Sequence, residues 1–165
     1  MDCDCVFNTF NRHGVEYLLI GGLNFMLRHV PVLTYDIDIW INDTPENRSR
    51  CEQALIDLGA EWGLRDEDWG PVSSMRPGWL ERQGMFCTMS PHGAIDIFRF
   101  VRGAGDWNEC RARAVAEATA NGTTYFGIAD EDMLRCQMAL DITERKLDRI
   151  STLNKILEKQ DHDKS

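Results

Sequence analysis

The sequence lacks the features that mark membrane, secreted and disordered proteins. No stretch approaches the roughly 20 apolar residues that a membrane-spanning helix needs, and the opening Met-Asp-Cys-Asp-Cys lacks the basic and apolar regions of a signal peptide. Only five of the 165 residues are proline and 43% are hydrophobic, so the composition carries no signature of disorder. We expect a cytoplasmic protein without membrane contact and with one folded core.

Positive charge is scarce. Eighteen Lys and Arg residues stand against 27 Asp and Glu residues, which gives a formal net charge of -9. Because phosphate contacts supply most non-specific nucleic-acid affinity, this balance disfavours long nucleic acid as a partner. A single nucleotide remains open, since a bound metal and a few arginines can neutralise its phosphates locally.

Paired cysteines are also missing. None of the six cysteines forms the Cys-x-x-Cys blocks expected of a structural zinc site, and we interpret them as reduced, mostly buried thiols. His92, in a Pro-His-Gly sequence, is more typical of an exposed turn residue than of a catalytic one.

The pattern that is present predicts an α+β fold. We expect strands over 15–20, 33–41, 84–89, 94–100 and 123–128, and helices over 5–12, 23–30, 45–58, 106–120, 130–141 and 145–159, the fifth capped by Asp130. The stretch 61–82 is rich in glycine and proline and reads as a long loop. These elements predict a small mixed β-sheet with helices on one face. Residues 1–104 would form the core, and 105–165 a mainly helical C-terminal extension packed on the same domain.

The strand over 33–41 carries paired acids. Its isoleucines share one face, while Asp36 and Asp38 share the other, close enough to hold one divalent cation. Asp96, between two isoleucines in a later strand, is the best candidate for a third ligand and for the base that deprotonates an acceptor hydroxyl. Taken alone, Asp36 and Asp38 are more typical of the solvent-facing side of a half-buried strand than of a metal site.

A glycine pair precedes these acids. Gly21-Gly22 follows a strand-like run and opens a helix-like segment that ends before Pro31. A bare glycine pair is most often a tight turn. The pair is more informative here because it precedes Asp36, Asp38 and Asp96, in that order and at a characteristic spacing.

Together these residues resemble the polymerase-beta-like nucleotidyltransferase superfamily. Its signature is a Gly-Gly or Gly-Ser turn opening a helix, an Asp-hydrophobic-Asp strand about ten residues on, and a hydrophobic-Asp-hydrophobic strand later. Here these parts read Gly21-Gly22-Leu23-Asn24, Asp36-Ile37-Asp38 and Ile95-Asp96-Ile97. The resemblance covers about 17–100 and is greatest to the bacterial minimal nucleotidyltransferases, which include antibiotic-modifying enzymes and toxins of toxin–antitoxin systems.

The resemblance implies a metal-dependent nucleotidyltransferase with a core over 1–104. It implies that Gly21, Gly22 and the helix start bind the phosphates of a nucleoside triphosphate such as ATP, assisted by Asn24 and Arg28. It also implies that Asp36, Asp38 and Asp96 hold two Mg²⁺ ions for transfer of a nucleoside monophosphate to a hydroxyl acceptor.

Alternatives remain at this point. Arg28 and Arg99, a further candidate for phosphate contact, are equally well read as surface arginines. Trp62, Trp69 and Trp79 either stack on a flat ligand or, more commonly, pack in the interior. The chain as a whole is either the enzyme, or a nucleotide-binding or toxin-like regulatory module acting with an antitoxin partner, or a structural α+β domain.

Overall fold

The computed structural model describes residues 1–163, which divide into two compact units. The first contains 1–100 and 116–127, and the second contains 101–115 and the described residues from 128 onward. The helices are α1 (Cys3–Arg12), α2 (Gly21–Arg28), α3 (Pro45–Asp57), α4 (Trp107–Arg113), α5 (Asp130–Ala139) and α6 (Leu147–Asp163). The strands are β1 (Tyr17–Leu19), β2 (Asp36–Ile41), β3 (Glu61–Trp62), β4 (Gly70–Pro71), β5 (Met85–Ser90), β6 (Gly93–Phe98), β7 (Val115–Ala118) and β8 (Thr124–Gly127). Three single-turn 3-10 helices, η1 (Asp66–Asp68), η2 (Val72–Ser74) and η3 (Trp79–Glu81), lie between β3 and β5.

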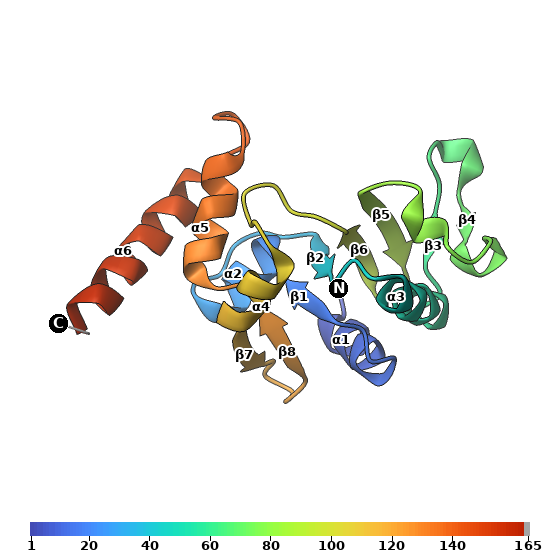
Figure 1. Ribbon diagram of the computed structural model, residues 1–165, viewed down its shortest axis with the longest axis horizontal. Helices are drawn as coiled ribbons and strands as arrows, with labels where there is room; N and C mark the ends of the chain where they lie inside the picture. The colour runs from blue at the N-terminus through green and yellow to red at the C-terminus, as the bar shows by residue number, and fades with distance from the viewer. Residues whose placement is uncertain (164–165) are drawn as a thin grey trace. The chain divides into compact units, whose positions relative to one another are not determined.

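One mixed sheet organises the first unit (Figure 1). Within the described residues its strand order is β4-β3-β5-β6-β2-β1-β8-β7. The central β2 runs parallel to β6 and antiparallel to β1, and β5 and β6 form an antiparallel hairpin. The α+β class with a mixed sheet is therefore confirmed.

The apolar face of this sheet builds the core. Ile37, Ile39 and Ile41 of β2 are fully buried, as are Ile95 and Ile97 of β6. These side chains belong to one cluster with buried residues of α1 and α3, among them Phe7, Phe10, Ala54 and Leu55. Burying each such side chain contributes roughly 1.5–3 kcal/mol, so the isoleucine alternation fixes which face of β2 turns inward.

The helix boundaries follow local sequence signals. The Thr44 side chain accepts a hydrogen bond from the Asn47 backbone N–H at 3.2 Å, and Pro45 occupies the first position of α3, as the sequence predicts. By contrast, Asp130 is not the cap of α5. Ala129 holds that position without a side-chain hydrogen bond, and Asp130 is a buried residue of the first turn.

Two regions differ from the sequence-based expectation. The segment 61–82 is not a simple loop, because β3 and β4 extend the sheet there and Trp62 and Trp79 stack with ring centroids 6.0 Å apart in the interior. The helix expected over 106–120 ends at Arg113. Val115 begins β7 instead, since a turn closed by Thr119 N–H to Thr123 O at 2.9 Å returns the chain into β8.

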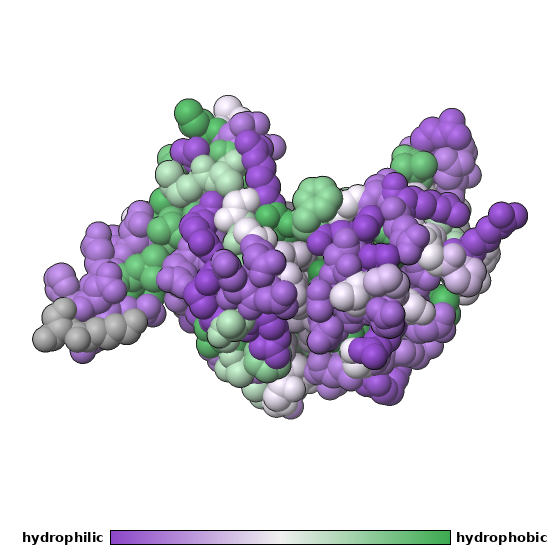
Figure 2. Space-filling view, in the orientation of Figure 1, coloured by the Kyte–Doolittle hydropathy of each residue, from purple (hydrophilic) through white to green (hydrophobic). Residues whose placement is uncertain are grey.

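The second unit is helical. Asp132 is fully buried and accepts hydrogen bonds from the guanidinium groups of Arg113, at 2.9 Å, and Arg135. Figure 2 shows hydrophobic residues over α5 and α6, and the exposed apolar side chains of this unit include Met138, Ile142 and Leu147. No helix among residues 1–163 combines the length and the apolar character needed to cross a membrane.

An ion-pair network fixes the ends of β2 and β6. Asp43, just beyond β2, accepts hydrogen bonds from both Nε and Nη2 of Arg99 at 2.8 and 2.9 Å and from Arg48 at 2.7 Å. Arg48 also pairs with Glu81 at 2.8 Å. Burial opposes the charge on Asp43, but the hydrogen bonds from Arg99 and Arg48 outweigh it and hold the pKa of this carboxyl below its ordinary value.

We expect Asp43→Asn to lower the free energy of unfolding by about 2 kcal/mol at pH 7, because it weakens charge-assisted hydrogen bonds that join β2, α3 and β6. A carboxyl with a lowered folded-state pKa stabilises the fold above its unfolded pKa of about 3.9 and loses that contribution as the pH falls through the folded value. In urea unfolding, the loss of unfolding free energy caused by Asp43→Asn should therefore be smaller at pH 3 than at pH 7. Asp57→Asn, which breaks exposed pairs with Arg12 and His13, is the control, and an equal loss in both variants would contradict the prediction.

Candidate functional site

Three carboxylates converge on the face of the sheet opposite the isoleucines. Asp36, Asp38 and Asp96 each offer an oxygen, and these oxygens lie within 4.8 Å of one another. Asp38 of β2 stands directly opposite Asp96 of β6, and Asp36 stands opposite Ala94. All three residues are partly exposed, so the group faces solvent and is open to a ligand.

The turn that leads into β6 is set locally. The β5–β6 turn is closed by the Ser90 hydroxyl, which donates to the Gly93 carbonyl at 2.9 Å and accepts from the His92 N–H at 3.1 Å. Gly93 has φ +121°, a conformation that glycine adopts without strain. A one-residue slip of β6 would turn Asp96 into the core and Ile95 outward, so the buried isoleucines keep Asp96 beside Asp38.

The charges of this cluster repel one another. Burial, and then the charge of Asp36, raises the pKa of the Asp96 carboxyl, while a hydrogen bond from Cys87 acts in the opposite direction. Oxygen donors alone are what hard divalent cations such as Mg²⁺ prefer. The cluster therefore fits a hard cation in charge and in ligand type.

The glycine turn touches this cluster. Gly21 has φ +67°, and a Cβ placed on it would lie 1.9 Å from Asp38 Oδ2. The Ile20 N–H also donates to the Asp38 carbonyl at 3.0 Å. Because α2 begins at Gly21, its N-terminus, where backbone N–H groups lack helical partners, lies against Asp38.

The other two residues predicted to bind nucleotide lie further along α2. Asn24 is fully buried and is in close contact with β8, since a Cβ on Gly127 would lie 2.1 Å from Asn24 Oδ1. Arg28 is in the last turn, roughly 10 Å along the helix from Gly21. Its side chain is 8% exposed and pairs with Glu117 at 3.9 Å. The structure thus brings Gly21 and the three acids together and leaves Gly22 next to Gly21 in the first turn of α2. It places Asn24 and Arg28 where α2 packs on the sheet.

The structure also places four further sequence candidates, Arg99 and three tryptophans. Arg99 binds Asp43 and donates to the carbonyls of Glu81 and Gln83, so these partners occupy the N–H donors of its guanidinium group. Trp62 and Trp79 pack in the interior, and Trp69 is 41% exposed.

Sequence reasoning missed one strand face beside the acids. Met85, Cys87 and Met89 alternate outward along β5, and Cys87 stands directly opposite Asp96. Burial, and then the charge of Asp96, raises the pKa of Cys87 to about 11. The alternation of these residues with Phe86 and Thr88, which are buried, could have revealed this face in the sequence. The outward side chains of β5 form an apolar surface beside Asp96.

We expect Asp96→Asn to raise the melting temperature of the chelator-treated protein at pH 7 by about 2 °C. A carboxyl whose folded-state pKa is raised favours the fold below its unfolded pKa and destabilises it as the pH rises through the folded value. The gain should therefore disappear near pH 3. Thermal unfolding of the variant and of Asp66→Asn, an exposed acid in η1, tests this, and a lower melting temperature for Asp96→Asn at pH 7 would contradict it.

Gly21→Ala should destabilise the fold more than Gly14→Ala. Both glycines have nearly the same positive φ, +67° and +64°, but a Cβ at position 14 meets nothing within 4 Å. Gly14→Ala should cost about 1 kcal/mol of backbone strain, and Gly21→Ala should cost roughly twice that because Asp38 must move. Urea unfolding measures both. Adding Asp38→Ala should recover part of the Gly21→Ala loss; equal costs for the two single variants would contradict the close contact.

Known structures share this fold. No family model matches the chain, and no curated protein matches its sequence. The crystal structure of ANT(2″)-Ia in complex with adenylyl-2″-tobramycin is similar, with a TM-score of 0.59 and 13% identity over 92% of this chain and 85% of that one. The solution structure of the antibiotic-resistance factor ANT(2″)-Ia gives a TM-score of 0.51 and 12% identity over 91% and 77%. The chain thus shares the fold of ANT(2″)-Ia, and at this identity the similarity shows the fold alone.

Proposed function

We propose that this chain is a nucleotidyltransferase that moves a nucleoside monophosphate from a nucleoside triphosphate to a hydroxyl acceptor. The observation that carries the proposal is the cluster of Asp36, Asp38 and Asp96, with ligand oxygens within 4.8 Å of one another beside the Gly21 turn. The fold shared with ANT(2″)-Ia supports it.

The three carboxylates are the proposed ligands of two Mg²⁺ ions. Their oxygens suit a hard cation, and their mutual repulsion calls for positive charge at this place. When bound, paired cations of this kind would reduce the electrostatic repulsion that opposes attack on a phosphate and would stabilise the leaving oxygen.

The chain's own groups orient the reactants. The backbone N–H groups at the start of α2, from Gly21 and Gly22 onward, are placed to receive the triphosphate. Asp96 is the proposed proton acceptor from the attacking hydroxyl. The hydroxyl oxygen forms a bond to the α-phosphorus, the bond from that phosphorus to the pyrophosphate oxygen breaks, and pyrophosphate leaves.

Asn24 and Arg28 take part in this proposal as positioning residues. Asn24 packs α2 on β8, and Arg28 ties the end of α2 to Glu117. Both contacts fix the direction in which the N-terminus of α2 points. Substituting either should weaken nucleotide binding through the placement of Gly21 and Gly22.

The proposed acceptor is a small molecule that carries a hydroxyl group. The net charge of -9 disfavours long nucleic acid, and ANT(2″)-Ia has been seen with an adenylylated small molecule. All the proposed site residues belong to the first unit, which contains 1–100 and 116–127. The division into a catalytic core over 1–104 and an extension over 105–165 stays a prediction.

Asp38→Asn should reduce transfer at least about a hundredfold, since it removes a carboxylate from the centre of the cluster without changing its size. The assay incubates purified protein with Mg²⁺, nucleoside triphosphates labelled at the α-phosphate and a cell extract, and then separates labelled protein, RNA and small molecules. Asp57→Asn, in an exposed ion pair at the end of α3 and outside the cluster, is the matched control and should keep full activity. Unchanged transfer by a folded Asp38→Asn variant would overturn the proposal.

Nucleotide-binding and thermal-shift measurements beside the transfer assay separate the alternatives. Mg²⁺-dependent nucleotide binding without any labelled product would favour a nucleotide-binding or toxin-like module that acts with an antitoxin partner. Absence of both binding and a metal-dependent thermal shift would favour a structural α+β domain.

A further inference from the structure

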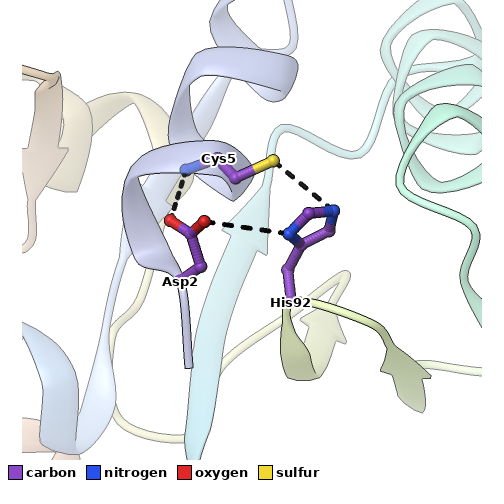
Figure 3. A group of neighbouring side chains, drawn as sticks. All are labelled: Asp2, Cys5 and His92. Atoms are coloured by element: carbon purple, nitrogen blue, oxygen red, sulfur yellow. Dashed lines mark hydrogen bonds and ion pairs between the residues drawn. The ribbon is translucent and has the colours of Figure 1, made fainter.

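A second group of metal-ligand side chains lies apart from the three acids. Asp2, Cys5 and His92 each offer one ligand atom, and these atoms lie within 4.8 Å of one another. Cys5 is in the first turn of α1, and His92 is in the β5–β6 turn, 87 residues later in the chain (Figure 3). Unlike the acid cluster, this group combines sulfur, nitrogen and oxygen donors.

The geometry suits a tetrahedral cation. Cys5 Sγ lies 3.5 Å from His92 Nε2. Zinc binds sulfur at about 2.3 Å and imidazole nitrogen at about 2.05 Å, and a tetrahedral angle between these bonds separates the two ligand atoms by roughly 3.6 Å. Figure 3 shows the three side chains facing one another, with the thiol toward Nε2 of the imidazole and the Asp2 carboxylate toward Nδ1; Asp2 Oδ2 is 3.9 Å from Nδ1. That distance is too long for a hydrogen bond, so this oxygen is available to a cation.

The backbone holds both segments in place. The Asp2 N–H donates to the His92 carbonyl at 2.8 Å, and the Cys5 N–H donates to Asp2 Oδ1 at 3.0 Å. The His92 N–H is bound by Ser90, and a Cβ on Gly93 would lie 3.4 Å from Met1 Cα. The three donors are therefore brought together by the fold, and only side-chain adjustment is needed to enclose an ion.

We propose that Asp2, Cys5 and His92 form a binding site for a zinc-class divalent cation, distinct from the oxygen-only cluster of Asp36, Asp38 and Asp96. Thiolate and imidazole ligands select such borderline-soft cations over Mg²⁺. Three protein ligands leave a fourth position for water, and the partial exposure of the His92 side chain, 32%, gives the ion access. A bound cation would join the start of α1 to the hairpin that carries Asp96. This inference does not depend on the proposed transferase activity.

Titration with Co²⁺ tests the site, because a Co²⁺–thiolate bond gives a charge-transfer absorption that oxygen ligands do not produce. The 165-residue chain should bind one equivalent with this absorption, and Zn²⁺ should displace it. Cys5→Ser should abolish the absorption, His92→Gln should weaken binding at least tenfold, and Asp2→Asn should weaken it about tenfold. Cys3→Ser is the matched control: Cys3 is in the same helix but not in the group, and its loss should change nothing.

A second pair of variants separates this site from the acid cluster, where Cys87 lies opposite Asp96. The absorption should persist in Cys87→Ser and in Asp38→Asn. Circular dichroism confirms that each variant is folded, and thermal shifts with Zn²⁺ should be lost only in the variants of Asp2, Cys5 and His92. An absorption that survives Cys5→Ser and disappears in Cys87→Ser would overturn the proposal, as would the absence of any thiolate absorption with saturating Co²⁺.

Discussion

The parallel pairing of β2 with β6 is the constraint on which the rest of the site depends. It places Asp38 directly opposite Asp96 and sets Asp36 one pleat away, so three like charges share a small area. Their repulsion opposes folding, and burial, followed by the charge of Asp36, raises the pKa of Asp96. The opposite face of the same strands offsets this cost, because Ile37, Ile39, Ile95 and Ile97 are fully buried. The buried isoleucines thus hold the outward-facing acids beside one another.

The glycine turn and the acid cluster are parts of one arrangement. Asp38 Oδ2 lies where a side chain at position 21 would begin, so the carboxylate occupies the space that the missing Cβ leaves. This contact sets a carboxylate against the positive end of α2, an arrangement that stabilises the negative charge. A phosphate arriving at the helix start would therefore meet the cluster directly. In the metal-free protein Cys87 adds no further charge there, since its pKa is raised to about 11.

The sequence predicted the parts of this structure that depend on short-range periodicity. The alternation of acids and isoleucines in 36–41 gave the correct faces of β2, and Thr44-Pro45 gave the correct start of α3. The sequence-based prediction failed where pairing between distant segments determines the secondary structure. Val115 enters a strand because β8 offers it an edge. β3 forms because β5 lies beside it, and β4 pairs in turn with β3. Likewise, nothing local to Arg99 shows that Asp43, 56 residues earlier, binds its guanidinium group. The roles of the three acids and of Gly21, Gly22, Asn24 and Arg28 stay predictions that the proposed experiments address.

The same distinction explains why the Asp2, Cys5 and His92 group is invisible in the sequence. Metal-site motifs are recognised when their ligands are close in the chain, as in a Cys-x-x-Cys pair. Here one ligand comes from a helix start and another from a hairpin turn, and the link between them is a backbone hydrogen bond from Asp2 to His92. The turn that presents His92 is also the turn that sets the register of Asp96. A cation bound at this group would therefore restrain the hairpin on which the acid cluster depends, which gives the two sites a physical connection through β6.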